Sequence, residues 1–139
     1  MNIDVGEPVW RELPEPRRLT GGELAVLAVL VEALDHEAVR AQLAGAVVCG
    51  VCRCGCSAVR LVSDAPPVPT SVIRRFTGGR RDDYLAVTAE GTNVHGETVQ
   101  LVLHLVDGRM EELEIFVGEG IQVVLGDDTV RNIVVSTSS

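Results

Sequence analysis

The sequence predicts a single α+β domain in which N-terminal helices pack on a mainly antiparallel sheet of about five or six strands. Three observations predict this class. An aliphatic stretch with helical spacing lies near the N-terminus, strand-like segments follow it, and the later segments have short connections. Short connections favour antiparallel pairing, because parallel strands need a crossover of a dozen or more residues.

Residue usage fits one domain with an ordinary core. The chain has 139 residues, of which 46% are hydrophobic, and this argues against disorder. We expect residues 1–16 to form a proline-bearing extended arm, anchored by Trp10, and residues 17–135 to form the domain. Residues 136–139 are expected to form a flexible tail.

Two helices are predicted at the start of the domain. Thr20 and Glu23 have the spacing of a capping box, in which each side chain satisfies a backbone donor of the other residue. The apolar residues that follow have helical spacing, so the first helix should run from about Gly21 to Leu34. A second helix from His36 to Leu43 should stop near Gly45.

Beyond Ala46 the pattern changes to strands. The proline cluster at 66–69 interrupts the series, since proline lacks the N–H donor that a sheet ladder needs. The predicted strands are Val47–Cys52, Ser57–Val62, Ser71–Arg75, Tyr84–Glu90, Thr98–Val106 and Glu111–Val117.

The last two predicted strands should form a hairpin with an irregular register. An ideal two-residue turn at Asp107-Gly108 would set Leu103 opposite Glu112 and place charge on the leucine face. Pairing Leu103 with Leu113 instead keeps the apolar side chains on one face. We therefore predict a three-residue loop or a bulge in place of the regular Val106–Arg109 register.

The polar face of this hairpin is a candidate for contact with a small ligand or an ion. Its residues are Gln100, His104, Glu112 and Glu114. The alternative is a solvated sheet face, which antiparallel sheets commonly have.

All four cysteines lie within eight residues, and these are the candidate metal ligands: Cys49, Cys52, Cys54 and Cys56. The C-x-x-C spacing of Cys49 and Cys52 is typical of zinc ligands. No second pair lies elsewhere in the sequence, so the expectation is no cofactor, with zinc as the alternative. Two further interpretations stay open: a thiol redox centre, and reduced cysteines that serve as small apolar side chains.

Other constellations give weaker indications. Four arginines surround Gly78-Gly79 and could hold an anion, or could belong to a solvated loop: Arg74, Arg75, Arg80 and Arg81. The three histidines stand outside any nucleophile motif, so catalytic residues stay unknown and the sequence does not decide whether the chain is an enzyme.

Charge and hydropathy limit the partners. A formal net charge of −8 disfavours nucleic acid, because phosphate binding needs a basic surface. The apolar run from Leu24 to Val31 is too short to span a bilayer and is bracketed by Glu23 and Glu32. We therefore expect a cytoplasmic protein that binds neither nucleic acid nor membrane.

Three short motifs resemble a family of small uncharacterised proteins of actinobacterial type. They are Arg18-Leu19-Thr20-x-x-Glu23, Cys52-x-Cys54-Gly55-Cys56 and Leu113-Glu114-Ile115-Phe116. The resemblance covers residues 17–117 and implies a shared α+β domain with a C-x-C-G-C strand. It implies no activity.

These observations favour a non-enzymatic cytoplasmic domain that contacts another protein or a second copy of itself. An ordinary core, no assignable catalytic set and strand edges open to pairing motivate this hypothesis. The alternatives are a zinc-binding module or a thiol redox protein that uses the Cys49–Cys56 cluster.

Overall fold

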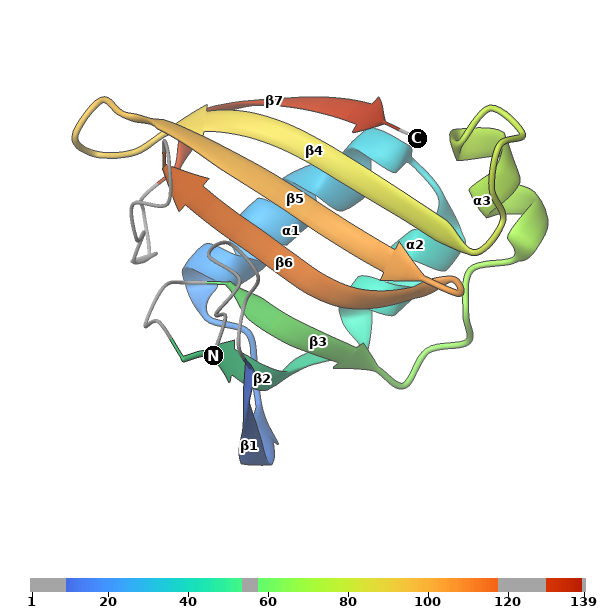
Figure 1. The fold of residues 1–139 in the computed structure, drawn as a ribbon, viewed down its shortest axis with the longest axis horizontal. Coiled ribbons are helices and arrows are strands. Elements are labelled where there is room, and N and C mark those ends of the chain that lie inside the picture. The colour runs from blue at the N-terminus through green and yellow to red at the C-terminus, as the bar shows by residue number, and fades with distance from the viewer. Residues whose placement is uncertain (1–9, 54–57, 118–129, 139) are drawn as a thin grey trace, which may run out of the picture.

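A seven-stranded antiparallel sheet with helices on one face forms the frame of the protein (Figure 1). The computed structural model describes residues 10–53, 58–117 and 130–138. The strand order is β1-β2-β3-β6-β5-β4-β7, and every neighbouring pair is antiparallel. The α+β class is confirmed, but the sheet has more strands than the five or six predicted.

The elements have the following bounds. The strands are β1 (Trp10–Arg17), β2 (Ala46–Cys52), β3 (Val59–Ser63), β4 (Tyr84–Thr92), β5 (Thr98–Val106), β6 (Arg109–Val117) and β7 (Arg131–Ser138). The helices are α1 (Gly21–Leu34), α2 (Glu37–Ala44) and α3 (Thr70–Phe76).

Helices α1 and α2 begin at side-chain caps and lie together behind the sheet (Figure 1). The Thr20 hydroxyl accepts from the Glu23 N–H at 3.1 Å, and the Glu23 carboxylate accepts from the Thr20 N–H at 2.9 Å. This capping box is the predicted one. His36 caps α2, because its Nδ1 accepts from the Ala38 N–H at 3.0 Å.

The core lies between these helices and the covered face of the sheet. Strand β5 turns four side chains to this face, and all are fully buried: Val99, Leu101, Leu103 and Leu105. Leu27 and Leu30 of α1 are equally buried and belong to the same cluster. Strict alternation along β5 therefore gives the sheet one apolar and one open face.

The β5–β6 hairpin combines a tight turn with a bulge. Val106 pairs with Arg109 across a two-residue turn, in which Asp107 and Gly108 have φ values of 50° and 79°. The register then shifts between Leu105 and His104, and Leu103 lies opposite Leu113. The predicted bulge is confirmed. The expectation that the Val106–Arg109 register would be absent is wrong, because the bulge follows the turn and restores the leucine face.

Gly108 also holds the chain that leads into α3. The Val68 N–H donates to the Gly108 carbonyl at 2.8 Å. A Cβ on Gly108 would lie 2.3 Å from the Val68 carbonyl oxygen, so only glycine fits this close approach.

Gln42 of α2 ties three segments together inside the protein. Its side chain is fully buried, and its Nε2 donates to the carbonyls of Pro66 and Ala65 at 2.8 and 3.1 Å. Its Oε1 accepts from the Met110 N–H at 3.1 Å. One amide therefore satisfies backbone groups of the β3–α3 connection and of β6.

The segment Ser71–Arg75, predicted as a strand, is helix α3. The Pro69 carbonyl accepts from the N–H groups of Val72 and Ile73, and both of these side chains are buried. The strand prediction is wrong because a seven-residue segment with β-branched residues gives the same sequence signal whichever element buries it.

Two further strands, β1 and β7, form the edges of the sheet and were not among those predicted. Strand β1 takes up the second half of the expected arm, and Trp10 pairs with Cys52 within the sheet. Strand β7 continues through Ser138, into the expected tail. Residues 1–9 of the arm and residue 139 lie outside the described residues.

Candidate functional site

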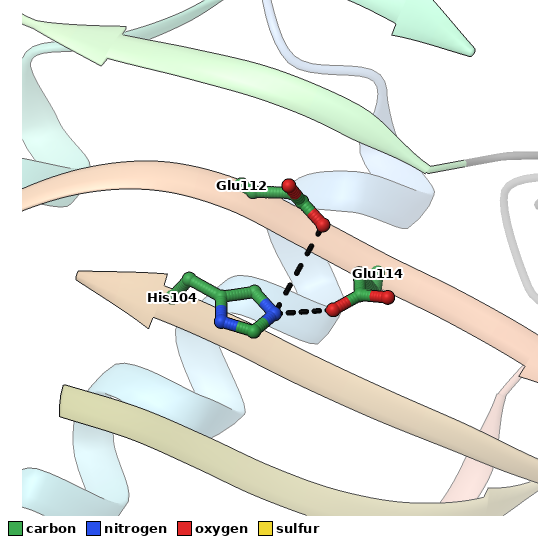
Figure 2. A group of neighbouring side chains, drawn as sticks. All are labelled: His104, Glu112 and Glu114. Carbon is green, nitrogen blue, oxygen red and sulfur yellow. Dashed lines mark hydrogen bonds and ion pairs between the residues drawn. The ribbon is translucent and has the colours of Figure 1, made fainter. Parts of the chain in front are cut away.

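Strands β4, β5 and β6 place a polar cluster on the open face of the sheet. Figure 2 shows His104 of β5 beside Glu112 and Glu114 of β6. His104 points away from the helices because its neighbours Leu103 and Leu105 point into the core. The bulge in β6 sets Glu112 opposite His104, and Glu114 follows two residues later on the same face.

The cluster is closely packed around the imidazole. His104 Nε2 is hydrogen-bonded to Glu114 Oε1 and lies 3.9 Å from Glu112 Oε2. On the other side of the ring, Nδ1 is hydrogen-bonded to the Tyr84 hydroxyl. The three side chains in Figure 2 are 20–30% exposed, so they are partly screened from water but open to a ligand.

These contacts shift the pKa values of the cluster in different directions. The hydrogen bond from Glu114 raises the pKa of His104, and the same bond lowers the pKa of Glu114. Burial and the Glu114 charge raise the pKa of Glu112 to about 7. Burial also raises the pKa of Tyr84. Glu112 is therefore the member of the cluster whose pKa lies near neutral pH.

The sequence identified most of this cluster. Of the four residues predicted to share the polar face, the structure brings together His104, Glu112 and Glu114. Gln100 lies on that face, but its amide donates to Glu90 at 3.0 Å. Tyr84 was missed; it begins β4 two residues before Ala86, which pairs with His104, and no local sequence pattern specifies this register.

The described cysteines do not form a cluster. Cys49 is half-buried at a register shift in β2, and Cys52 is buried at the end of the same strand. Within the described ranges, neither belongs to a group of three or more side chains that could hold a metal ion. Cys54 and Cys56 lie outside the described residues, so the four-cysteine zinc site stays a prediction.

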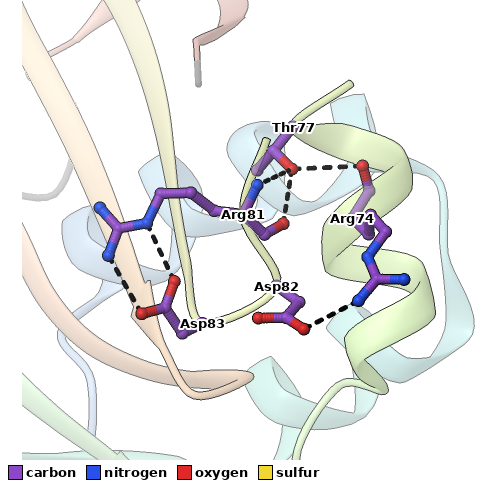
Figure 3. Close-up of polar contacts among 5 residues, drawn as sticks. All are labelled: Arg74, Thr77, Arg81, Asp82 and Asp83. Carbon is purple, nitrogen blue, oxygen red and sulfur yellow. Dashed lines mark hydrogen bonds and ion pairs between the residues drawn. The ribbon is translucent and has the colours of Figure 1, made fainter. Parts of the chain in front are cut away.

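The arginine loop after α3 is held by its own aspartates (Figure 3). Arg74 donates to Asp82 at 2.9 Å, and Arg81 makes two hydrogen bonds with Asp83, at 2.9 and 3.1 Å. The buried Thr77 hydroxyl donates to the Arg81 carbonyl at 2.6 Å. These contacts favour the interpretation of a structural, solvated loop over that of an anion site.

Arg81 connects this loop to the polar cluster. Its guanidinium carbon lies 5.1 Å from the centre of the Tyr84 ring, a cation–π contact. Tyr84 in turn is hydrogen-bonded to His104. The loop therefore fixes the ring that orients the histidine.

A shallow groove lies on the opposite side of the molecule, among α1, α2 and β2. Its volume is about 490 Å³. Leu24, Val31 and Leu43 line it, and Arg40 at its rim is paired with Glu32 at 3.0 Å.

The two edges of the sheet differ in their capacity to accept another strand. Strand β1 contains Pro14 and Pro16, which have no N–H to donate, and its register with β2 is irregular. Strand β7 contains no proline, pairs regularly with β4 over most of its length, and carries Val134 with 72% of its surface exposed. The β7 edge is therefore the second candidate site.

No family model, curated protein or solved structure matches this chain. The resemblance to actinobacterial-type proteins with a C-x-C-G-C strand therefore stays a prediction. Among the described segments, no helix has the length and apolar character that crossing a membrane requires.

Proposed function

We propose that this chain is a non-enzymatic cytoplasmic interaction domain whose β7 edge pairs with the β7 edge of a second copy. The observation that carries the proposal is the position of β7, which ends the strand order and, among the described strands, pairs with β4 alone. An edge strand presents unpaired backbone donors and acceptors along its outer side, and these template the addition of another strand.

The residue types of β7 favour pairing. Ile133, Val134, Val135 and Thr137 are β-branched, and Arg131 is the single charged residue of the strand. Proteins commonly protect an exposed edge with proline, charge or an irregular register. Strand β1 has all three protections, and β7 has none of them over most of its length.

A second copy is the occupant that the sequence of the edge favours. Antiparallel pairing of an edge with itself is self-complementary about a two-fold axis, so one edge supplies both halves of the interface. Arg131 lies at the start of β7, so centred antiparallel pairing sets it opposite the uncharged end of the other strand. Because β1 is blocked, the assembly closes as a dimer and does not grow into a fibre.

Light scattering coupled to size-exclusion chromatography tests the proposal. We expect a dimer of the unaltered chain at about 100 µM protein and a monomer for Val134→Lys, since an edge lysine opposes strand pairing. Val94→Lys is the matched control, because Val94 is 62% exposed in the connection between β4 and β5. It should remain dimeric.

Two results would overturn the proposal. One is a monomeric unaltered chain at that concentration, and the other is a Val134→Lys variant that dimerises as well as the Val94→Lys control. Hydrogen exchange adds a local measurement: protection of β7 amides should rise with protein concentration, while protection of β1 amides should not.

A further inference from the structure

We infer that His104, Glu112 and Glu114 form a binding site for one divalent transition-metal ion on the open face of the sheet. One imidazole nitrogen and two carboxylate oxygens converge there, and the three ligand atoms all lie within 4.8 Å of one another. This inference does not depend on the β7 interface.

The separations suit a shared ion. Bonds of about 2.0–2.2 Å to nitrogen and oxygen place neighbouring ligand atoms about 3–3.5 Å apart around a metal. His104 Nε2 and Glu112 Oε2 are 3.9 Å apart, so a small rotation of the glutamate brings both atoms to one ion. Glu114 already contacts Nε2, and the ion would take the place of the proton between them.

Tyr84 holds Nδ1 of His104 and thereby directs Nε2 towards the carboxylates. Metal-binding histidines commonly use their second ring nitrogen in an outer hydrogen bond, which fixes the tautomer and the ring orientation. The Nδ1–Tyr84 bond supplies this contact and leaves Nε2 to bind the ion. Arg81 covers the Tyr84 ring and is itself paired with Asp83, so the outer contacts of the site extend to the loop after α3.

The donor set and its charge point to the chemical class of the ion. Imidazole suits zinc and iron, and carboxylates suit manganese and magnesium, so a mixed set favours Mn²⁺, Fe²⁺ or Zn²⁺. Two carboxylates face one imidazole, and within the described ranges no arginine forms an ion pair with either of them. Three protein ligands would leave the remaining positions on the ion to water or to a small anion.

Calorimetric titration of the full chain with Mn²⁺ and with Zn²⁺, after treatment with a chelator, tests the site. We expect one ion per chain at this site, with affinity about tenfold or more weaker in His104→Gln and in Glu114→Gln. Glu90→Gln is the matched control, because it removes a carboxylate from the same face outside the cluster. Its affinity should match that of the unaltered chain.

Two further variants distinguish loss of the metal ligands from loss of the fold. Glu112→Gln preserves the shape of a ligand side chain, and circular dichroism would show that each variant keeps its sheet. Tyr84→Phe removes only the outer hydroxyl, and we expect about tenfold weaker binding without loss of stoichiometry. A merely structural tyrosine would leave the affinity unchanged.

The result that overturns the inference is metal binding that is equal in the unaltered chain and in folded His104→Gln and Glu112→Gln. Zinc held by the cysteines alone would give this result. Absence of stoichiometric binding of both ions would overturn it as well.

Discussion

Leu103 and His104 are neighbours on β5, yet they belong to two different environments. Leu103 is fully buried beneath the helices, and His104 is partly exposed between two carboxylates on the open face. Polar groups on the covered side have partners; within the described part of the chain, no buried side-chain nitrogen or oxygen lacks one. One strand thus separates the face that stabilises the fold from the face that can bind a ligand.

The largest expected effect comes from truncation on the covered face. Leu103→Ala should lower the free energy of unfolding by about 3 kcal/mol, because Leu103 is fully buried between Val87 and Leu113 and the neighbouring chains cannot fill the space. Urea denaturation measures the change. Val102→Ala, on the open face of the same strand, should cost less than about 1 kcal/mol. Equal losses would contradict the division between faces.

A polar residue on the covered side should also matter for stability. Gln42→Met keeps the length of the side chain but leaves the Met110 N–H and the Pro66 carbonyl without their partner, so we expect a loss of about 2 kcal/mol. The control is Gln100→Met on the open face, which should cost less than about 0.5 kcal/mol. Chemical denaturation of both variants would refute this if Gln42→Met proved as stable as its control.

On the open face, removing a charge should stabilise the metal-free protein. The pKa of Glu112 is raised to about 7 by burial and by Glu114, so the folded state holds this proton more tightly than the unfolded state. Stability from this group is highest at low pH and is lost as the pH rises through about 7. Above that pH, Glu112→Gln should be more stable than the unaltered chain by about 1 kcal/mol.

Urea denaturation of Glu112→Gln and of the unaltered chain, repeated over a range of pH, measures this effect. The advantage of the variant should grow from the ordinary pKa of 4.5 up to about pH 7 and then level off, because between these values the unfolded chain has lost the Glu112 proton that the folded chain still holds. Glu90→Gln, on the same face, serves as the control. A constant difference between variant and unaltered chain across the range would contradict the assignment to Glu112.

The smallest effect concerns Glu23, the carboxylate of the capping box at the start of α1. Burial alone would raise the pKa of Glu23, but the Arg17 hydrogen bonds and the bonds from Thr20 lower it overall. Its contribution is therefore present above the ordinary pKa of 4.5 and is lost as the pH falls through the lowered value. Glu23→Gln should cost about 1 kcal/mol at neutral pH.

Stability curves against pH compare Glu23→Gln with Glu32→Gln. Glu32 forms an exposed ion pair with Arg40, so its replacement should change stability by less than about 0.5 kcal/mol. If both variants lose the same stability at neutral pH, the capping box is not the source of the Glu23 effect.

Local signals predicted much of the fold. The capping box places the start of α1 at Gly21, and alternation gives β5 its observed bounds, because each signal acts within one element. The bulge in the β5–β6 hairpin is predicted because a regular two-residue turn at Asp107-Gly108 would set Leu103 opposite Glu112. Strands β1 and β7 depend instead on partners far away in the sequence, and proline in β1 is compatible with an edge.

The candidate site shows the same limit. The alternation of side chains along two strands predicts that His104, Glu112 and Glu114 share a face, and the structure brings these side chains together. Tyr84 joins them through β4, whose register with β5 no local pattern specifies. The cysteines attract attention by their number, but alternation along β2 leaves Cys49 half-buried and Cys52 buried, so these two do not share one face of the strand.

The close approach of Val68 to Gly108 joins two segments that lie far apart in the sequence. The amide of Val68 donates to a carbonyl that the β5–β6 turn presents, so the β3–α3 connection has this partner only where the hairpin has formed. We therefore expect the connection to take its final path after the hairpin has formed and α3 to dock late in folding. Larger residues at position 108 would clash with the Val68 carbonyl and would also strain the turn, since Gly108 has a φ of 79°.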